Sequence, residues 1–459
     1  MGSSAPEALA PPDGGYGWVI VFAVLLQLML AGPIMPMFGI IFGPMFAEFE
    51  TTPSEQTSIF AIYLVSWNLI TLFVGPLTEL RSERFVALCS TTLIVGGLVL
   101  CAFATSTYDF MICYGLLVGC GIGLGNANGI FIINKYFKNR VGAAFGLMAT
   151  GLAISSQVCP QIVKVLITHL TGRQTILVYA SLCCASYIGA LLMRDVRPLL
   201  RPLEGRDLEE HQARLLAFPP PEKEELPTKG FCANFIIFRV FRMINWRLLC
   251  DPNFILIALG NSIAFTCNLS YIPMLREICK ERHLDLGQTA NLLTILGVME
   301  MIGRPFWGFL GDSALLRRLT FTPKKLVYTV CGLSISLGYV AITFTDSFPS
   351  LALTACFLSL CGSGMMVNSA LVFAESFGHN LPSAIGLSNL SRAAVAILIG
   401  PLIGLLKENY GSFNIALYFM AGLTAAGMLA WILAGCFCHL DKRPQKARDP
   451  EKETKPQSS

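Results

Sequence analysis

Long apolar runs separated by short polar breaks make up most of the chain. Each run comes close to the ~20 residues that an α-helix needs to cross the hydrocarbon core of a bilayer. The pattern therefore predicts an all-α membrane protein with twelve transmembrane helices. The runs lie near residues 17–42, 57–80, 85–106, 110–133, 141–168, 175–193, 253–275, 287–310, 323–345, 350–373, 384–405 and 413–437.

The spacing of these runs divides the chain into two halves of six helices each. The segment between the halves is rich in charge and proline, which favours a flexible linker. The predicted parts are an N-terminus at 1–16, a first six-helix bundle at 17–193, a linker at 194–250, a second six-helix bundle at 251–438 and a tail at 439–459.

The overall composition supports a membrane protein. Hydrophobic residues make up 54% of the chain and charged residues 14%, whereas soluble proteins carry about 25% charged residues. The sixteen cysteines lie mostly inside apolar runs, where cysteine acts as a small hydrophobic residue. Since the sequence has no C-x-x-C with a matching partner and no histidine cluster, we expect neither a metal site nor a cofactor.

The basic residues alternate between the two sides of the predicted membrane. Most Lys and Arg residues fall in the breaks that share a side with both termini, including Lys135, Lys138 and Arg140. Cytoplasmic loops of membrane proteins carry such an excess, so both termini are predicted to be cytoplasmic, with the plasma membrane as the expected location. Because the basic residues follow membrane topology, no nucleic-acid partner is expected, and membrane lipids are.

An internal repeat relates the two halves. Gly75-Pro-Leu-Thr-Glu79 ends the second run, and Gly308-Phe-Leu-Gly-Asp312 ends the eighth. Repeated six-helix halves build the major facilitator fold, with the substrate site between them near mid-membrane. We predict that Glu79 and Asp312 belong to a gating or topology motif on the cytoplasmic side and touch no substrate. The plainer alternative is a tight turn with a solvated salt bridge.

Two charges interrupt the eighth apolar run. Glu300 and Arg304 are four residues apart, which places them on one helical face. A charge at membrane depth costs a few kcal/mol, so it normally faces a wet cavity or a bundle interior. The pair is either a structural ion pair or a site for substrate and proton, and the second reading is preferred. In the fourth run, Asn126 lies among glycines spaced for close helix packing and is a further candidate for the cavity wall.

Several motifs give the chain a resemblance to a known family. Asp13, Gly14, Gly15, Tyr16, Gly17 and Trp18 enter the first run in succession. Lys135-Tyr-Phe-Lys-Asn-Arg140 and Gly146-Leu-Met-Ala-Thr-Gly151 open the fifth. Together they resemble the signatures of the monocarboxylate transporters, a branch of the major facilitator superfamily. The resemblance implies a carrier of lactate, pyruvate, ketone bodies or, in some branches, aromatic amino acids.

The resemblance also implies roles for individual residues. In the proton-coupled branch an acid and an arginine on helix 8 serve the proton and the carboxylate, and Glu300 and Arg304 fall on those positions. Arg140 matches a family arginine at the start of helix 5. Ile40 stands where proton-coupled members have a lysine, and Met366 replaces an aromatic residue that narrows the pocket of lactate carriers.

Arg392 adds a cation at membrane depth that the lactate branch lacks. Together with Ile40 and Met366, it favours a larger or different organic acid over lactate coupled to a proton. The substrate-binding candidates are thus Arg304, Arg392, Arg140, Met366 and Asn126, with Glu300 for the proton.

The predicted function is secondary-active or facilitated transport of a monocarboxylate or related organic acid by alternating access. The alternatives are an uncoupled carrier of aromatic amino acids or similar metabolites, and a sensor or scaffold with the same fold. An enzyme is not expected, because no Ser/His/Asp set, His-Glu-x-x-His or phosphate loop is present. Some relatives need a single-span glycoprotein to reach the cell surface, so such a partner is included among the expectations.

Overall fold

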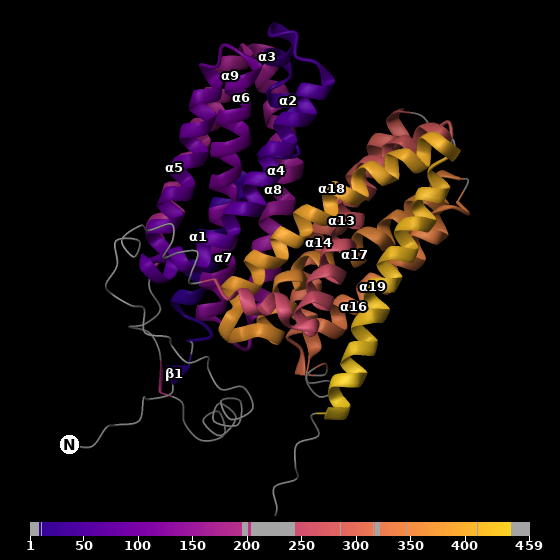
Figure 1. Cartoon of the computed structure of the whole chain (residues 1–459). Helices are drawn as coiled ribbons and strands as arrows, with labels where there is room; N and C mark the ends of the chain where they lie inside the picture. The colour runs from indigo at the N-terminus through magenta and orange to yellow at the C-terminus, as the bar shows by residue number, and fades with distance from the viewer. Residues whose placement is uncertain are drawn as a thin grey trace, which may run out of the picture.

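The structure is a computed structural model that describes residues 9–10, 12–194, 201–202, 244–284, 286–314, 316, 322–345, 347–410 and 412–441. Within them, twelve helices are long and apolar enough to cross a membrane. They form two bundles, coloured indigo to magenta and orange to yellow in Figure 1, that meet at one end and diverge at the other. The predicted all-α fold with two six-helix halves is thereby confirmed.

The first bundle is built from helices that begin at Tyr16 and end at Leu192. Its elements are α1 (Tyr16–Ala31), η1 (Gly32–Ile34), α2 (Phe38–Ile41), α3 (Gly43–Glu48), α4 (Pro53–Leu80), α5 (Glu83–Ala102), α6 (Thr107–Phe110), η2 (Met111–Val118), α7 (Gly119–Tyr136), α8 (Val141–His169), α9 (Gly172–Cys183) and α10 (Ser186–Leu192).

The second bundle follows a short helical turn, η5. Its elements are η5 (Trp246–Cys250), α13 (Pro252–Glu281), α14 (Leu286–Gly311), α16 (Pro323–Ile342), α17 (Phe348–Phe377), η6 (Gly378–Asn380), α18 (Leu381–Tyr410) and α19 (Phe413–Asp441). Two short strands outside the bundles, β1 (Leu9–Ala10) and β2 (Arg201–Pro202), pair antiparallel. Most of the predicted linker and most of the tail lie outside the described residues.

The length of the first apolar run predicted a single helix, but the run is divided into several helical pieces. α1 ends at Ala31, and η1, α2 and α3 follow as separate short pieces. Pro33 and Pro36 explain the break, because proline lacks the N–H that a helix interior needs and its ring clashes with the preceding turn. The chain therefore bends before it reaches the far side of the bundle.

Glycines hold the first bundle together, as their spacing in the fourth run predicted. A Cβ on Gly119 would come within 2.8 Å of the Tyr63 carbonyl oxygen, and one on Gly123 within 2.5 Å of that of Trp67. Both contacts are with the backbone of α4, so no side chain fits between the two helices. Gly121 makes the corresponding close approach to α5 at Ile94. Small residues at this spacing allow helices to pack backbone to backbone.

The two bundles touch along two seams, where α14 packs on α8 and α18 packs on α4. In the first seam, a Cβ on Gly308 would lie 2.4 Å from the carbonyl oxygen of Gly142. In the second, a Cβ on Gly75 would lie 2.3 Å from the Cβ of Pro382. Gly75 and Gly308 are the matched glycines of the repeat, so the two seams are built on equivalent positions of the two halves.

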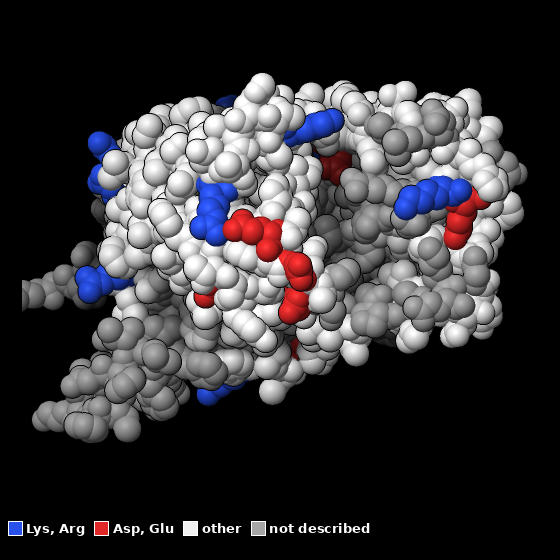
Figure 2. Space-filling view, turned by 90° about the horizontal axis from the view of Figure 1, so that it is seen from above, with Lys and Arg blue, Asp and Glu red and all other residues white. Residues whose placement is uncertain are grey.

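Two names describe the ends of the molecule from here on. The narrow end is where the bundles meet, and it carries the start of α8 at Val141 and the end of α14 at Gly311. The wide end is where they diverge, and it carries α2, α3 and the start of α9 (Figure 1). Seen from the wide end, the surface is hollowed between the two lobes, and acidic atoms are visible at depth there (Figure 2).

Candidate functional site

Glu300 and Arg304 form an ion pair within α14, on the seam with α8. Nη2 of Arg304 donates to Oε2 of Glu300 over 2.7 Å, as the four-residue spacing predicted. Nη1 of Arg304 donates across the seam to the carbonyl oxygen of Ala149 on α8, over 2.6 Å. The guanidinium therefore joins the two halves of the molecule. Its Nε is buried and has no hydrogen-bond partner among the described residues.

The two members of the pair differ in their access to solvent. The side chain of Arg304 is 9% exposed and that of Glu300 is 30% exposed. The arginine is thus held in the seam, while the Glu300 side chain is only partly covered. The hydroxyl of Ser363 on α17 lies 3.5 Å from the Glu300 backbone carbonyl and marks the neighbouring wall.

Arg392 lies in the second bundle, half-buried on α18. Its Nη2 donates to Oδ1 of Asn261 over 2.8 Å and to Oγ of Ser369 over 3.2 Å. Its Cζ lies 3.9 Å from the centre of the Phe265 ring, which is a cation–π contact. All of these partners are neutral.

Met366 separates the two arginine sites on the surface of α17. Ser363 faces Glu300, and Ser369 faces Arg392. Met366 is three residues from each, so at 3.6 residues per turn it lies between them, about 60° from either. Its side chain is 40% exposed. Met366 is therefore exposed on α17 between Ser363 and Ser369, and its place in the substrate pocket stays a prediction.

The remaining binding candidates lie in less central places. Arg140 is exposed directly before α8, nine residues from Ala149, or roughly 13 Å along the helix. The structure thus does not bring Arg140 together with Arg304. Asn126 is half-buried on α7, between the face of Gly123 that packs on α4 and the face of Gly129 that packs on α1.

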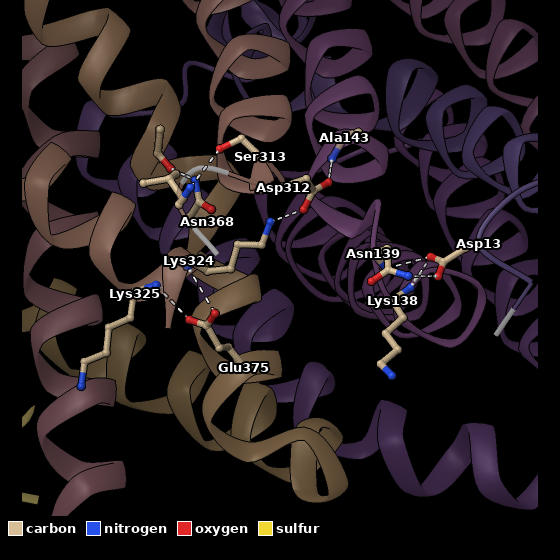
Figure 3. Close-up of polar contacts among 12 residues, drawn as sticks. Asp13, Lys138, Asn139, Ala143, Asp312, Ser313, Lys324, Lys325, Asn368 and Glu375 are labelled. Atoms are coloured by element: carbon tan, nitrogen blue, oxygen red, sulfur yellow. Dashed lines mark hydrogen bonds and ion pairs between the residues drawn. The ribbon is translucent and has the colours of Figure 1, made fainter. Parts of the chain in front are cut away.

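Asp312 connects the two bundles at the narrow end (Figure 3). Its Oδ2 accepts a hydrogen bond from the Ala143 backbone N–H over 2.7 Å, in the first turn of α8. Its Oδ1 pairs with Nζ of Lys324 at the start of α16. Both side chains are about nine-tenths buried, at 10% and 9% exposed. The alternative of a solvated salt bridge is therefore wrong for Asp312, whereas Glu79, its counterpart, is exposed.

Asp13 of the signature ties the start of α1 to the loop between α7 and α8 (Figure 3). Its Oδ1 accepts from the backbone N–H groups of Lys138 and Asn139 over 2.6 and 2.8 Å, and its Oδ2 accepts from Nδ2 of Asn139 over 3.0 Å. Gly15 has a φ of +57°, a conformation that glycine adopts without steric cost.

The later signature residues complete this connection. Trp18 packs edge-on against Phe137, with ring centres 5.0 Å apart. Gly17 leaves room for the same ring, since a Cβ there would lie 2.9 Å from its Cζ. The Tyr16 hydroxyl donates to the Leu192 carbonyl oxygen over 2.7 Å. The signature is thus a structural clasp among α1, α7 and α10, away from the two arginines.

Sequence reasoning missed several residues of the site. Asn261, Phe265 and Ser369 hold Arg392, and the carbonyl of Ala149 holds Arg304. Asn261, a polar residue inside an apolar run, was the one available signal. No group of three metal-binding side chains occurs in the part of the chain that the structure describes.

Comparison with known proteins agrees with this architecture. The sequence profile of the Major Facilitator Superfamily matches residues 17–323 and 257–459. Monocarboxylate transporter 12 of Mus musculus is 24% identical over 453 residues, which cover 96% of this chain and 89% of the relative. Monocarboxylate transporter 2 of Homo sapiens is 23% identical over 471 residues, covering 99% and 94%.

Solved structures extend the comparison to the fold. The structure of the proton:xylose symporter XylE bound to 6-bromo-6-deoxy-D-glucose superposes with a TM-score of 0.64 at 12% identity, over 93% of this chain and 96% of that chain. At this identity the likeness concerns the fold alone. Profile, relatives and fold agree: the chain is a multi-pass membrane transporter of the Major Facilitator Superfamily, and its relatives are monocarboxylate transporters.

Proposed function

We propose that the protein carries a monocarboxylate or related organic acid across the plasma membrane by alternating access, with Arg304 binding the carboxylate. The names of the relatives support this substrate class. The observation that carries the proposal is the position of Arg304, whose guanidinium lies in the seam and bonds both halves at once.

This position couples binding to movement of the halves. A guanidinium binds a carboxylate through two parallel hydrogen bonds, which are stronger than neutral ones. An incoming carboxylate competes with Glu300 and with the Ala149 carbonyl for the same N–H groups. The bond to Ala149 is a contact between the halves. Its loss therefore changes the stability of the state in which α8 and α14 are in contact, relative to the state in which they are apart. A ligand shifts such an equilibrium only through this difference in affinity.

Glu300 is the proposed proton carrier. When the substrate carboxylate binds Arg304, the Glu300 carboxylate loses its counter-charge and can bind a proton instead. Glu300 is 30% exposed, so its side chain is not sealed inside the protein. One anion and one proton would then move together without net charge, and no lysine at Ile40 is needed. If Glu300 stays ionised throughout the cycle, the carrier is uncoupled, as the alternative for aromatic amino acids requires.

The charges near the narrow end support a proposal for the orientation. Lys135, Lys138 and Arg140 lie there, and a cluster of basic residues is typical of the cytoplasmic side. We therefore propose that the narrow end is cytoplasmic, as are both termini, and that the wide end opens outward. A single-span glycoprotein partner stays a prediction.

Uptake by the Arg304→Ala variant tests the proposal. Labelled organic acids are offered to cells that express the full chain, with the surface amount measured in parallel. We expect uptake to fall at least about 100-fold, since a buried charged anchor is removed, while the surface amount is kept. Arg173→Ala is the matched control, because Arg173 forms an exposed ion pair with Glu48 at the wide end. Normal uptake by Arg304→Ala would contradict the assignment of Arg304 as the carboxylate-binding residue and favour the sensor or scaffold.

A further inference from the structure

We infer that Arg392 is a second anion subsite, so that the preferred cargo carries two acidic groups, as a short dicarboxylate does. The inference rests on the proposed function and names its substrate class more closely. It begins from the charge of Arg392, which forms no salt bridge among the described residues. Its described partners are an amide oxygen, a hydroxyl and an aromatic ring. A cation at this depth costs a few kcal/mol, so an arriving anion meets a strong electrostatic attraction.

The guanidinium also has donors to spare. It carries five N–H bonds, and the described hydrogen bonds come from Nη2 alone. Its Nε is buried with no partner among the described residues. Asn261 is fully buried and Ser369 is 7% exposed, so both hold the group in one place. Phe265 covers one flat face of the guanidinium, which leaves the edges for hydrogen bonds. Such a fixed group with free edge donors suits a carboxylate.

Arg392 lies on α18 near the contact of this helix with the first half. Ser391 lies against α13, where its hydroxyl is 2.7 Å from that of Ser262. Asn389 lies against the first half, where its Nδ2 donates to the Thr71 hydroxyl on α4 over 3.1 Å. At 100° per residue Arg392 lies between these two faces. It therefore lies near the contact of α18 with the first half, while its described partners are on α13 and α17.

Both arginines can be placed along α17. Ser363 contacts the Glu300 backbone carbonyl, one turn before Arg304, and Ser369 contacts the Arg392 guanidinium. The two serines are six residues apart, which is roughly 9 Å of helix rise and a separation that one small molecule can span. The exposed side chain of Met366 lies between these two serines. A flexible apolar side chain there can pack against the carbon chain of a substrate whose two ends reach the two arginines.

The charges of the site favour two acidic groups over one. Glu300, Arg304 and Arg392 sum to −1 + 1 + 1 = +1. A single carboxylate at Arg304 displaces Glu300 and leaves Arg392 without a counter-charge. A second carboxylate at Arg392 supplies that counter-charge, and with a proton on Glu300 the loaded site is neutral, since −2 + 2 = 0. The second acidic group is thus what compensates the charge of Arg392.

The test compares uptake of labelled glutarate and butyrate, which differ by a terminal carboxylate, in cells expressing the full chain. For the unaltered protein we expect glutarate uptake to exceed butyrate uptake at least about ten-fold. In Arg392→Gln the ratio of glutarate to butyrate uptake should fall by about ten-fold, with a smaller fall in Arg392→Lys, which keeps the charge but not the planar fork. Arg173→Gln is the matched control and should keep the ratio.

The outcomes separate this inference from the proposed function. Loss of all uptake in Arg304→Ala together with an unchanged ratio in Arg392→Gln overturns the second subsite alone. A preference of the unaltered protein for butyrate does the same. Uptake of neither acid, or normal uptake in Arg304→Ala, overturns both. If Arg392→Gln does not reach the surface, thermal stabilisation of the purified unaltered protein decides, since it should be greater with glutarate than with butyrate.

Discussion

The two halves share one fold but fill their interiors differently. In the first half, aromatic rings occupy the core near the wide end, where the Phe38 ring contacts those of Phe42, Phe46, Phe60 and Tyr114. In the second half, Glu300, Arg304 and Arg392 lie within transmembrane helices. Under the proposed function, the second half supplies the charged groups that bind the substrate and the proton.

The first half still contributes to the site, through its backbone. Ala149 offers only its carbonyl oxygen to Arg304. Gly146 offers only space, since a Cβ there would lie 2.9 Å from the Arg304 carbonyl oxygen. The comparison indicates that the second half, which carries the charges, packs on an uncharged surface of the first half. The two surfaces can separate and come together again during a transport cycle. Three experiments on variants test this difference between the halves.

The largest expected effect comes from Glu300→Gln. The amide keeps the shape of the carboxyl but cannot bind a proton. Uptake by the unaltered protein should rise as the outside pH falls, by up to about ten-fold per pH unit for one coupled proton. In Glu300→Gln that slope should disappear, as measured by uptake at several pH values. Glu48→Gln, in the exposed pair of the first half, is the control and should keep the slope. A slope that persists in Glu300→Gln would move the proton to another group.

A moderate effect is expected from Asp312→Asn, and almost none from Glu79→Gln. The two acids occupy matching positions in the halves, but Asp312 is buried against Lys324 and Ala143, whereas Glu79 is exposed. Removing the charge of one partner from a buried ion pair costs on the order of 3 kcal/mol. A change at an exposed site stays within about 0.5 kcal/mol.

Thermal unfolding of the purified proteins measures both changes. Asp312→Asn should unfold at a temperature several degrees lower, and its uptake should fall several-fold because the narrow end is held less firmly. Equal behaviour of the two variants would contradict the difference between the halves.

The smallest effect is expected from Tyr114→Phe in the first half. The Tyr114 ring stacks on Tyr63 with centres 5.0 Å apart, while its hydroxyl is buried without a hydrogen-bond partner among the described residues. Removing such a hydroxyl keeps the stacking and relieves its desolvation, so stability should change by less than about 1 kcal/mol. Uptake should stay within about two-fold of the unaltered protein. A large loss of uptake would show that the aromatic core takes part in binding.

The fold could be predicted largely because its main signal is local. Hydropathy over about twenty residues reports each membrane crossing, and the glycine spacing reports the contact of α7 with α4. The break in the first helix could have been predicted from Pro33 and Pro36, but the prediction followed the length of the apolar run. The buried state of Asp312 was not within reach, because it depends on the start of α8, far away in the chain.

The candidate site divides along the same line. The pair of Glu300 and Arg304 follows from a spacing of four residues on one helix, so the sequence alone predicted it. The bond from Arg304 to Ala149 and the partners of Arg392 join helices that are distant in sequence, and no local pattern encodes them. Arg140 shows a further limit, because a motif match gives a residue's position along the chain but not its depth in the fold, and its role in binding stays a prediction.

The contact of Gly142 and Gly146 with Gly308 has a mechanical consequence. Seams between helices usually interlock, with side-chain ridges of one helix in the grooves of the other, so separating them requires many side chains to disengage. Here bare backbone meets bare backbone. The two backbone surfaces attract each other at short range, but no interlocking side chains must disengage when they separate. This seam can therefore act as a hinge about which the two bundles rotate.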